Sequence, residues 1–544
     1  MVRFFVILQE KNHLPLSSTK TRMHKSRQQG NAGGFLCFRH FYYFCGMEQQ
    51  PKIDLIDSQK RVLKQMTDFV FGSTDRVFIL KGYAGTGKTT LMRFLIEELK
   101  NRKQGFTLLS TTGRAAKILS NHTDCHASTI HSMIYKFSDF NKDVSDLDPK
   151  TASIETTGQL FLVFEPSVLS NDDRDAMVYI IDEASMVSDF EQKDIVQAQF
   201  GSGKVLTELL AYDTLDKSKF IFVGDPCQLP PVLGTLSPAL STDYFESRFG
   251  LHAQQGVLTE IMRQDNSIIA AGTYIRKLWA NAPEFESAYP RGNYWGAPLR
   301  MSQYKDFEIH ADLAEMEELY LDCIRQHGYN HSIFICNSNS KCSEMSERIR
   351  KALGFGGSAK QGDLLMVVQN QMTTGLMNGD MVEVAEIRSE TERVFRDVKT
   401  PDGYHTTLMF REIKVKELFT QKVYSTMLLE NPLEMKQVNL DSRQQSGLFL
   451  DFILRMKRRG IDPKRKPKDF EKAMREDPYL NALRCNYGYA VTCHKAQGGE
   501  WESVFIQMPR NITLKPTKNK YQWFYTAITR AKQTVHLCKD FFIA

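Results

Sequence analysis

The chain lacks the features that would assign it to several special classes of protein. It has no apolar run approaching the length of a membrane span, no internal repeat and no low-complexity segment. Its ten cysteines are scattered, with no C-x-x-C pair. Neither a zinc site nor a disulfide framework is therefore expected, and reduced thiols in a cytoplasmic protein are predicted.

The chain also has only a small excess of one charge over the other. The 544 residues include 70 Lys or Arg and 64 Asp or Glu, giving a net charge of +6. This mild basic balance is compatible with a nucleic-acid groove, but it does not establish one. The bias is too small for a polybasic protein.

Residues 1–46 differ in character from the rest of the chain. They contain seven Lys or Arg but a single acid, Glu10, and they end in "CFRHFYYFCG". From Met47 onward the composition becomes ordinary. Our preferred interpretation is that Met47 is the natural start and that the preceding stretch is not native. A poorly ordered tail and a mitochondrial transit peptide are the alternatives.

From there on, short apolar runs alternate with helical patterns, which is typical of parallel sheets covered by helices. Strands are predicted at 77–80, 107–110, 178–181, 220–223, 333–336, 504–507 and 534–538. Helices are predicted at 58–69, 89–100, 114–120 and 264–278. Two stretches break this rhythm and look like insertions: 136–176, with a hairpin-like piece, and 376–480, with short strands and a basic run.

The clearest chemical signal is a phosphate-binding loop. Gly82 to Thr89 satisfies G-x-x-x-x-G-K-[ST] between an expected strand and an expected helix. Glycines let successive N–H groups point into one concavity, at the positive end of the helix. Lys88 can reach terminal phosphates, and the Thr89 hydroxyl can bind Mg²⁺. The predicted nucleotide contacts are Gly82, Gly85, Thr86, Gly87, Lys88, Thr89 and Thr90.

Two later strands supply candidates for the other half of this site. The run "VYIIDEASMV" ends in Asp182 and Glu183. One carboxylate can hold Mg²⁺ together with Thr89, and its neighbour can orient or deprotonate a water. The run "FIFVGDPCQLPPV" places Asp225 and Gln228 on a loop beside them, where Gln228 can sense a γ-phosphate or the attacking water.

At this point the sequence resembles a known family. "GYAGTGKTT", "IIDEASMV", "VGDPCQLPPV", "YAVTCHKAQGGEW" and "YTAITRAK" are similar to the ordered motifs of superfamily 1 helicases, above all to the RecD/Dda branch. The resemblance runs from Leu55 to the C-terminus. It implies an ATP- and Mg²⁺-dependent DNA helicase that moves 5′ to 3′ on single-stranded DNA.

The resemblance also implies a division into domains. Residues 47–135 and 177–263 would form the first RecA-like motor domain, and 264–375 and 481–544 the second. Residues 136–176 would carry a β-hairpin pin that splits the duplex, and 376–480 an SH3-like module.

Further nucleotide contacts are implied by the same motifs. Gln59 matches the adenine-reading glutamine, although a polar residue at a helix start is the alternative. Arg263 and Arg530 match arginines that contact the γ-phosphate from the first and second motor domains, and Glu500 matches an acid near the ribose.

A strand-binding groove is implied as well. Its expected residues are Thr111, Thr112, Arg114, Thr129, His131, Asn337, Ser338, Thr492, His494 and Lys495. Helix capping or packing is the alternative for each of them. In the pin, Phe161 and Phe164 are candidates for stacking on bases, or equally for the aromatic core of a small subdomain.

Other functions remain open at this level. Asp402, Glu412 and Lys414 form a loose PD…ExK match, which would suit a Mg²⁺-dependent nuclease. An ATP-gated clamp that does not unwind, a helicase subunit of an exonuclease complex and an RNA track are further alternatives. Expected partners are single-stranded DNA, duplex junctions and possible replication or repair proteins. A monomer is expected, which in a bacterium would be associated with the nucleoid.

Overall fold

In the computed structural model the chain divides into two compact units, Met1–Asp57 and Ser58–Ala544. The structure describes residues 54–140, 162–169, 175–191, 198–215, 217–232, 234–262, 267–399, 405–463, 465–509, 512–539 and 543. The segment 1–46, with its three interpretations, lies outside the described residues. None of the helices in the described ranges is both long and apolar enough to cross a membrane.

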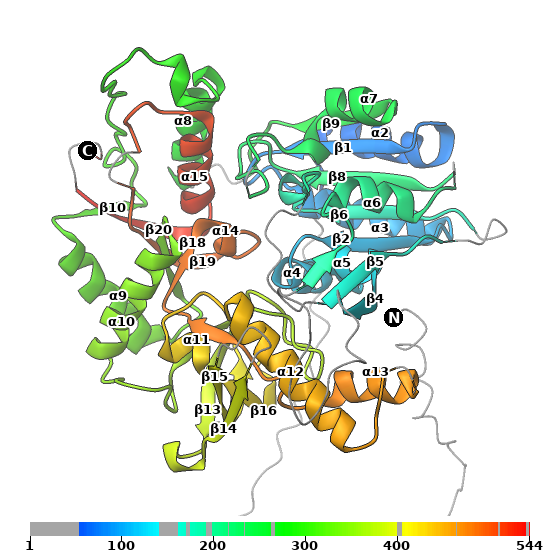
Figure 1. The fold of residues 1–544 in the computed structure, drawn as a ribbon. Helices are drawn as coiled ribbons and strands as arrows, with labels where there is room; N and C mark the ends of the chain where they lie inside the picture. Colours follow the sequence, from blue (N-terminus) through cyan, green and yellow to red (C-terminus); the bar gives the residue numbers. More distant parts are fainter. Residues whose placement is uncertain are drawn as a thin grey trace, which may run out of the picture. The chain divides into compact units, whose positions relative to one another are not determined.

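The first lobe, which comprises the described residues from 58 to 262, is built on a six-stranded sheet of order β3-β2-β6-β8-β1-β9. All of its strand pairs are parallel (Figure 1). The strands are β1 (Val77–Gly82), β2 (Phe106–Ser110), β3 (Ala127–Thr129), β6 (Val178–Asp182), β8 (Lys219–Gly224) and β9 (Ala253–Leu258). The helices are α2 (Asp57–Gly72), α3 (Lys88–Asn101), α4 (Gly113–Thr123), α5 (Ile130–Ile134), α6 (Val205–Tyr212) and α7 (Thr242–Phe249).

The second lobe, which comprises the described residues from 267 to 363 and from 488 to 543, has a parallel sheet of order β10-β20-β19-β11-β18. Its strands are β10 (Phe307–His310), β11 (Ser332–Cys336), β18 (Ala490–Thr492), β19 (Trp501–Ile506) and β20 (Ala531–Cys538). Its helices are α8 (Ser267–Asn281), α9 (Leu313–His327), α10 (Asn339–Ala352), α14 (Cys493–Ala496) and α15 (Lys518–Ile528). Two parallel sheets flanked by helices confirm the predicted pair of RecA-like domains.

The predicted β insertion forms an antiparallel sheet of order β14-β15-β13-β12-β17, with β16 added on β15. Its strands are β12 (Leu364–Val367), β13 (Met381–Ile387), β14 (Val394–Lys399), β15 (His405–Glu417), β16 (Val423–Leu429) and β17 (Cys485–Tyr487). The helices α11 (Asn431–Glu434), α12 (Ser442–Arg458) and α13 (Pro467–Glu476) come after β16 along the chain. The sheet thus extends beyond the predicted limits of 376 and 480 on both sides, because β12 and β17 pair with each other.

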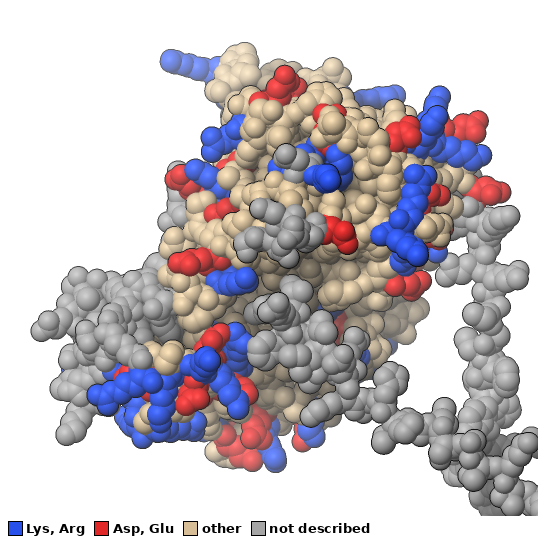
Figure 2. Space-filling view, turned by 90° about the vertical axis from the view of Figure 1, so that its right-hand side faces the viewer, with Lys and Arg blue, Asp and Glu red and all other residues tan. Residues whose placement is uncertain are grey.

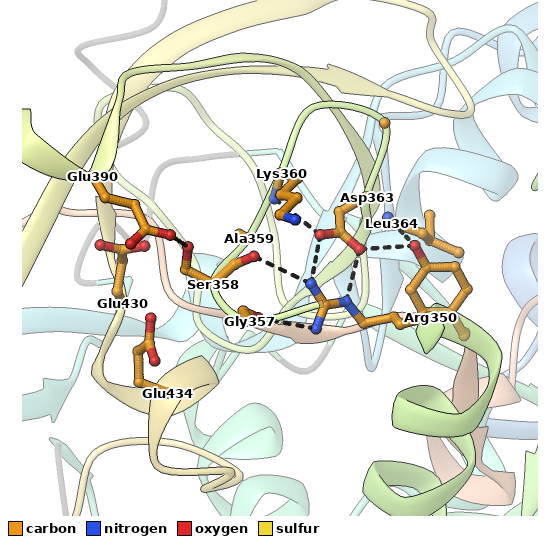
Figure 3. Close-up of polar contacts among 12 residues, drawn as sticks. Arg350, Gly357, Ser358, Ala359, Lys360, Asp363, Leu364, Glu390, Glu430 and Glu434 are labelled. Carbon is orange, nitrogen blue, oxygen red and sulfur yellow. Dashed lines mark hydrogen bonds and ion pairs between the residues drawn. The ribbon is translucent and has the colours of Figure 1, made fainter. Parts of the chain in front are cut away.

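A buried ion pair of the second lobe holds the chain just before it enters this insertion (Figure 3). Arg350 of α10 donates from Nε and Nη2 to the two oxygens of Asp363, at 2.8 Å each. Tyr489, just before β18, donates its hydroxyl to the same carboxylate at 2.9 Å. A bidentate guanidinium–carboxylate pair has one preferred orientation, so it fixes the entry of the chain into β12.

The predicted hairpin at 136–176 corresponds in part to a small sheet of order β4-β5-β7. Its strands are β4 (Tyr135–Phe140), β5 (Leu162–Pro166) and β7 (Ala198–Phe200). The antiparallel arms are β4 and β5, and the residues between them lie outside the described part of the chain. Short 3₁₀ helices cover Ala184–Met186, Pro238–Leu240, Glu286–Ala288 and Glu390–Glu392.

Candidate nucleotide cleft and strand-binding residues

The phosphate loop connects β1 to α3 as predicted. Gly85 and Gly87 have φ angles of 78° and 83°, a left-handed backbone that glycine adopts at little cost. A Cβ on Gly82 would lie 2.8 Å from Thr86 Oγ1, so this position tolerates no side chain without a shift. Lys88 donates from Nζ to the carbonyl oxygens of Gly82 (2.7 Å) and Tyr83 (3.2 Å), which holds its ammonium group over the loop.

Gln59 and Thr86 support this loop from within. Gln59 is buried and donates from Nε2 to the Thr86 carbonyl oxygen at 3.1 Å. The Thr86 hydroxyl donates to the Tyr83 carbonyl oxygen at 2.8 Å. Thr89 and Thr90 are half-buried in the first turn of α3. Gln59 therefore touches the loop itself, and does not merely start a helix.

Asp182 and Glu183 leave β6 at the carboxyl edge of the sheet, where β1 also delivers the phosphate loop. Burial, and then the charge of Glu183, raise the pKa of Asp182 to about 7, against the opposing charge of Lys88. Two adjacent carboxylates with so little compensation favour a bound cation. With the Thr89 hydroxyl they offer only oxygen ligands, which fits Mg²⁺.

Gln228 contacts both lobes. With its amide oriented to satisfy both polar atoms, Nε2 donates to Glu183 Oε2 at 3.1 Å. In the same orientation its oxygen accepts a hydrogen bond from Arg530 Nη2 at 3.2 Å. One buried side chain therefore joins the acid pair of the first lobe to an arginine encoded near the C-terminus.

Arg530 comes just after α15 and is buried rather than solvated. Its guanidinium donates to the Thr526 carbonyl oxygen (3.1 Å), the Gly499 carbonyl oxygen (3.3 Å) and Thr529 Oγ1 (3.2 Å). These bonds hold the planar fork in one orientation, with the Gln228 amide against one of its nitrogens.

Sequence reasoning missed three residues of α15 that hold the Gln228 loop. Tyr525 donates its hydroxyl to Asp225 Oδ2 (2.7 Å) and accepts from the Ala84 N–H of the phosphate loop (3.0 Å). Gln522 donates to the carbonyl oxygens of Pro226 and Gln228, and Thr526 accepts from the Leu229 N–H. Their three- and four-residue spacing marks one helical face, a signal that was readable in the motif around Arg530.

Arg263 and Glu500 are the two remaining predicted nucleotide contacts. Arg263 lies outside the described residues. Glu500 is exposed immediately before β19.

Three of the predicted strand-binding hydroxyls cap helices. Thr112 accepts from the Ala115 N–H (3.2 Å), Thr129 from the Ser132 N–H (3.2 Å), and Ser338 from the Lys341 N–H (3.3 Å). This is the capping alternative for these side chains. Phosphate binding at these helix starts stays a prediction.

Other groove candidates pack against the protein. Arg114 lies over the ring of Trp501, 4.4 Å from its centroid, so it joins α4 to the start of β19. His131 packs against Tyr135 and Phe200 at centroid distances of 5.4 and 5.3 Å, and burial lowers its pKa. The Thr111 hydroxyl is directed at Met186 Sδ, 3.8 Å away.

The candidates in the second lobe are at least partly exposed to solvent. Asn337 is exposed at the end of β11. Thr492 and Lys495 line a pocket together with Asn339 and Tyr487. Burial lowers the pKa of both His494 and Lys495, which are half-buried on α14.

The pin aromatics are only partly described. Phe161 lies outside the described residues. Phe164 is half-buried, stacks on Phe200 at 4.7 Å and meets Phe137 edge-on at 5.8 Å. This packing matches the aromatic-core alternative for Phe164, and stacking on bases stays a prediction.

Two further expectations concern charge and nuclease chemistry. On the face shown in Figure 2, Lys and Arg are interspersed with Asp and Glu and form no continuous basic stripe. In the loose nuclease match, Glu412 pairs with Arg388 and Lys414 pairs with Glu386, while Asp402 lies outside the described residues. Each described member is thus engaged in an ordinary surface ion pair.

The motifs of this cleft recur in known families. Residues 54–278 match the AAA domain family, and residues 487–538 match the UvrD-like helicase C-terminal domain family. The chain is thus similar to an ATPase domain family around the phosphate loop and to a helicase domain family around Arg530.

Curated proteins similar to this chain come from a virus, a phage and an archaeon. An uncharacterized protein of Acanthamoeba polyphaga mimivirus is 22% identical over 532 residues, covering 87% of this chain and 98% of the relative. The ATP-dependent DNA helicase Dda of Enterobacteria phage T4 is 30% identical over 226 residues, covering 41% of this chain and 43% of Dda. An uncharacterized Methanocaldococcus jannaschii protein is 24% identical over 485 residues, covering 85% of this chain and 36% of the relative.

Solved structures similar to this chain include Pif1 from Bacteroides in complex with ADP-AlF₃ and single-stranded DNA. That chain is 13% identical, with a TM-score of 0.41, and the match covers 90% of this chain and 94% of the other. A structure of two coordinating Pif1 helicases at forked DNA is 15% identical, with a TM-score of 0.42, and covers 90% and 93% of the two chains.

Proposed function

We propose that this protein is a helicase that hydrolyses ATP with Mg²⁺ to translocate 5′ to 3′ on single-stranded DNA and to unwind duplexes ahead of it. The observation that carries the proposal is the position of Gln228 between Glu183 and Arg530. A γ-phosphate bound there would contact side chains of both lobes at the same time. Its loss on hydrolysis then changes how the lobes are held, which is the requirement for a motor.

Each side chain has a distinct task in this scheme. Lys88 would neutralise the terminal phosphates, and Thr89 and Asp182 would hold Mg²⁺, which would supply further positive charge to the phosphates. Glu183 orients and deprotonates the attacking water, and Gln228 positions that water against the γ-phosphate. Arg263 and Arg530 stabilise the charge on the phosphate oxygens in the transition state.

The loop of residues 225–229 is the coupling element. It carries Gln228 at the nucleotide and is hydrogen-bonded to three side chains of α15 in the second lobe. A small displacement of Gln228 is therefore passed directly to α15. Because α15 leads into Arg530, a shift of α15 also moves the arginine that contacts the same phosphate.

The decisive experiment combines DNA-stimulated ATP hydrolysis with strand separation on matched duplexes carrying a 5′ or a 3′ single-stranded tail. We expect hydrolysis to rise with single-stranded DNA and unwinding to require the 5′ tail. Unwinding only from the 3′ tail would contradict the polarity. Hydrolysis that does not respond to DNA would contradict the coupling of the two lobes to a strand.

A second candidate is an ATP-gated clamp that holds a strand without separating duplexes. The packing of Phe164 inside an aromatic cluster favours it, since this side chain is not free to act as a wedge. The same assay distinguishes the two functions, because a clamp hydrolyses ATP in response to DNA but leaves both tailed duplexes intact.

A further inference from the structure

A second group of chemically active side chains lies in the second lobe on the two neighbouring strands β10 and β20. These strands pair in parallel, with Glu308 opposite His536 and His310 opposite Cys538. Alternate residues of a strand share one face of the sheet, so Glu308, His310 and His536 project on the same side. Cys538 Sγ lies 3.9 Å from Met316 Sδ, which identifies this side as the one covered by α9.

The three ligand-type atoms are close to one another. His310 Nε2 lies 3.1 Å from His536 Nδ1, and His536 Nδ1 lies 3.3 Å from Glu308 Oε2. All three ligand atoms fall within 4.8 Å of one another. Around tetrahedral Zn²⁺, with bonds of about 2.0–2.1 Å, neighbouring ligand atoms are separated by roughly 3.3 Å. The spacing therefore suits one ion without rebuilding the strands.

Both imidazoles are held in place. His310 and His536 are buried, and the His536 ring stacks on Phe505 with a centroid distance of 4.1 Å and an interplanar angle of 9°. The Glu308 side chain is 55% exposed, which gives an ion a route from solvent.

Glu315 places a second carboxylate beside the ring of His310. His310 Nδ1 lies 3.6 Å from Glu315 Oε1, at the start of α9. The other oxygen of Glu315 accepts from the Ala311 N–H at 2.7 Å, which limits its motion. A carboxylate facing the non-ligating nitrogen fixes the tautomer and orientation of a metal-binding histidine.

We propose that His310 Nε2, His536 Nδ1 and Glu308 Oε2 form a site for a late first-row divalent cation, with Zn²⁺ as the first choice. Water would complete the coordination. Imidazole ligands select such ions over Mg²⁺, so this site is chemically distinct from the nucleotide cleft. A bound ion ties the edge strand β10 to β20 independently of ATP. The alternative is a plain hydrogen bond between two neutral rings.

The test uses the full chain, stripped of metal with a chelator and titrated with Zn²⁺ in saturating Mg²⁺. We expect one tight site in the native protein, a rise in melting temperature on binding, and the ligand-field absorption of a nitrogen-and-oxygen site with Co²⁺. E308Q should weaken Zn²⁺ binding at least about tenfold. Because Glu308 is exposed, this change does not threaten folding.

The matched control is H252N. His252 forms a comparable contact, with Nδ1 3.1 Å from Asp75 Oδ2. Among the described residues, however, this pair does not belong to any group of three or more potential metal ligands. We expect this variant to bind Zn²⁺ like the native chain. H310N, judged only if its metal-free circular dichroism matches the native protein, should remove the site. No tight binding by the native chain, or equal affinity in E308Q, would overturn the proposal.

Discussion

At the scale of single residues, the ammonium of Lys88 is held by two loop carbonyl oxygens, those of Gly82 and Tyr83. We expect K88A to lower the turnover number for ATP at least about 100-fold, because a positive charge aimed at developing phosphate charge is lost. Binding of a labelled single-stranded oligonucleotide should be partly retained. ATP hydrolysis and fluorescence anisotropy measure the two effects.

The control for this change is K100A, which removes an exposed lysine at the other end of α3. It should leave hydrolysis within about twofold of the native rate, as expected for a surface site. Normal ATP turnover by K88A would show that the nucleotide site has been misassigned.

Gln228 gives a more specific test, because it bridges two groups without carrying charge. We expect Q228A to bind nucleotide with nearly native affinity but to lose about 10²-fold in turnover, since the bridge serves the reacting phosphate rather than the nucleotide base. Steady-state kinetics with and without DNA separate the two effects. A large rise in KM with unchanged turnover would instead assign Gln228 to binding alone.

Individual residues could be predicted where the local backbone pattern fixes their position, and were ambiguous where one side chain suits two roles. The places of Gly85, Lys88 and Asp182 in the fold could be predicted from the sequence because strand-loop-helix backbone geometry fixes them, while their contacts with nucleotide and metal stay predictions. Thr112 and Thr129 were ambiguous, since a hydroxyl before a helix serves equally as a cap or as a phosphate contact. The structure shows the caps, and binding to a strand stays a prediction.

At the scale of elements, the contact between α15 and the 225–229 loop is the most informative. Tyr525 is fully buried and connects Asp225 with the phosphate loop through one hydroxyl. We expect Y525F to cost about 1 kcal/mol in stability and to lower DNA-stimulated hydrolysis more than basal hydrolysis. Thermal unfolding and ATPase titrations with DNA provide the two readouts.

Tyr521, one turn earlier on α15, offers a matched comparison because its hydroxyl makes neither of these contacts. Y521F should keep the native ratio of DNA-stimulated to basal hydrolysis. If Y525F also kept that ratio, the hydroxyl would serve stability only, and coupling through the loop would need another route.

Elements were predictable where the chain carries a short apolar run between loops, even when the run pairs far along the chain, as β1 does with β8. The apolar runs that became β1, β6 and β8 are short, buried and bounded by loops. The edges of the insertion sheet were not predictable, because β12 and β17 pair across the whole inserted segment. Pairing at that range leaves no local signature for a single sequence to display.

At the scale of the whole molecule, the first lobe also meets the insertion. Lys117 of α4 forms an ion pair with Asp380, whose carboxylate is almost fully buried. Burial raises the pKa of Asp380 although Lys117 opposes this effect. K117A would therefore leave a buried charge without its partner, and we expect a clear loss of stability.

The pH dependence of that loss has a definite sign. A carboxyl group whose pKa is raised by folding stabilises the protein at low pH, and this contribution disappears as the pH rises through the folded pKa. K117A should thus lower the melting temperature more at neutral than at mildly acidic pH, and K117A/D380N should recover part of the difference. An equal loss at both pH values would contradict an unpaired carboxylate as the cause.

The pairing of β12 with β17 has a consequence for the history of the protein. The chain enters and leaves the inserted segment on two hydrogen-bonded neighbours, with Leu365 opposite Tyr487. Their separation does not depend on how much polypeptide is looped out between them. This arrangement allows the insertion to be lengthened, shortened or replaced during evolution while the second lobe keeps its geometry.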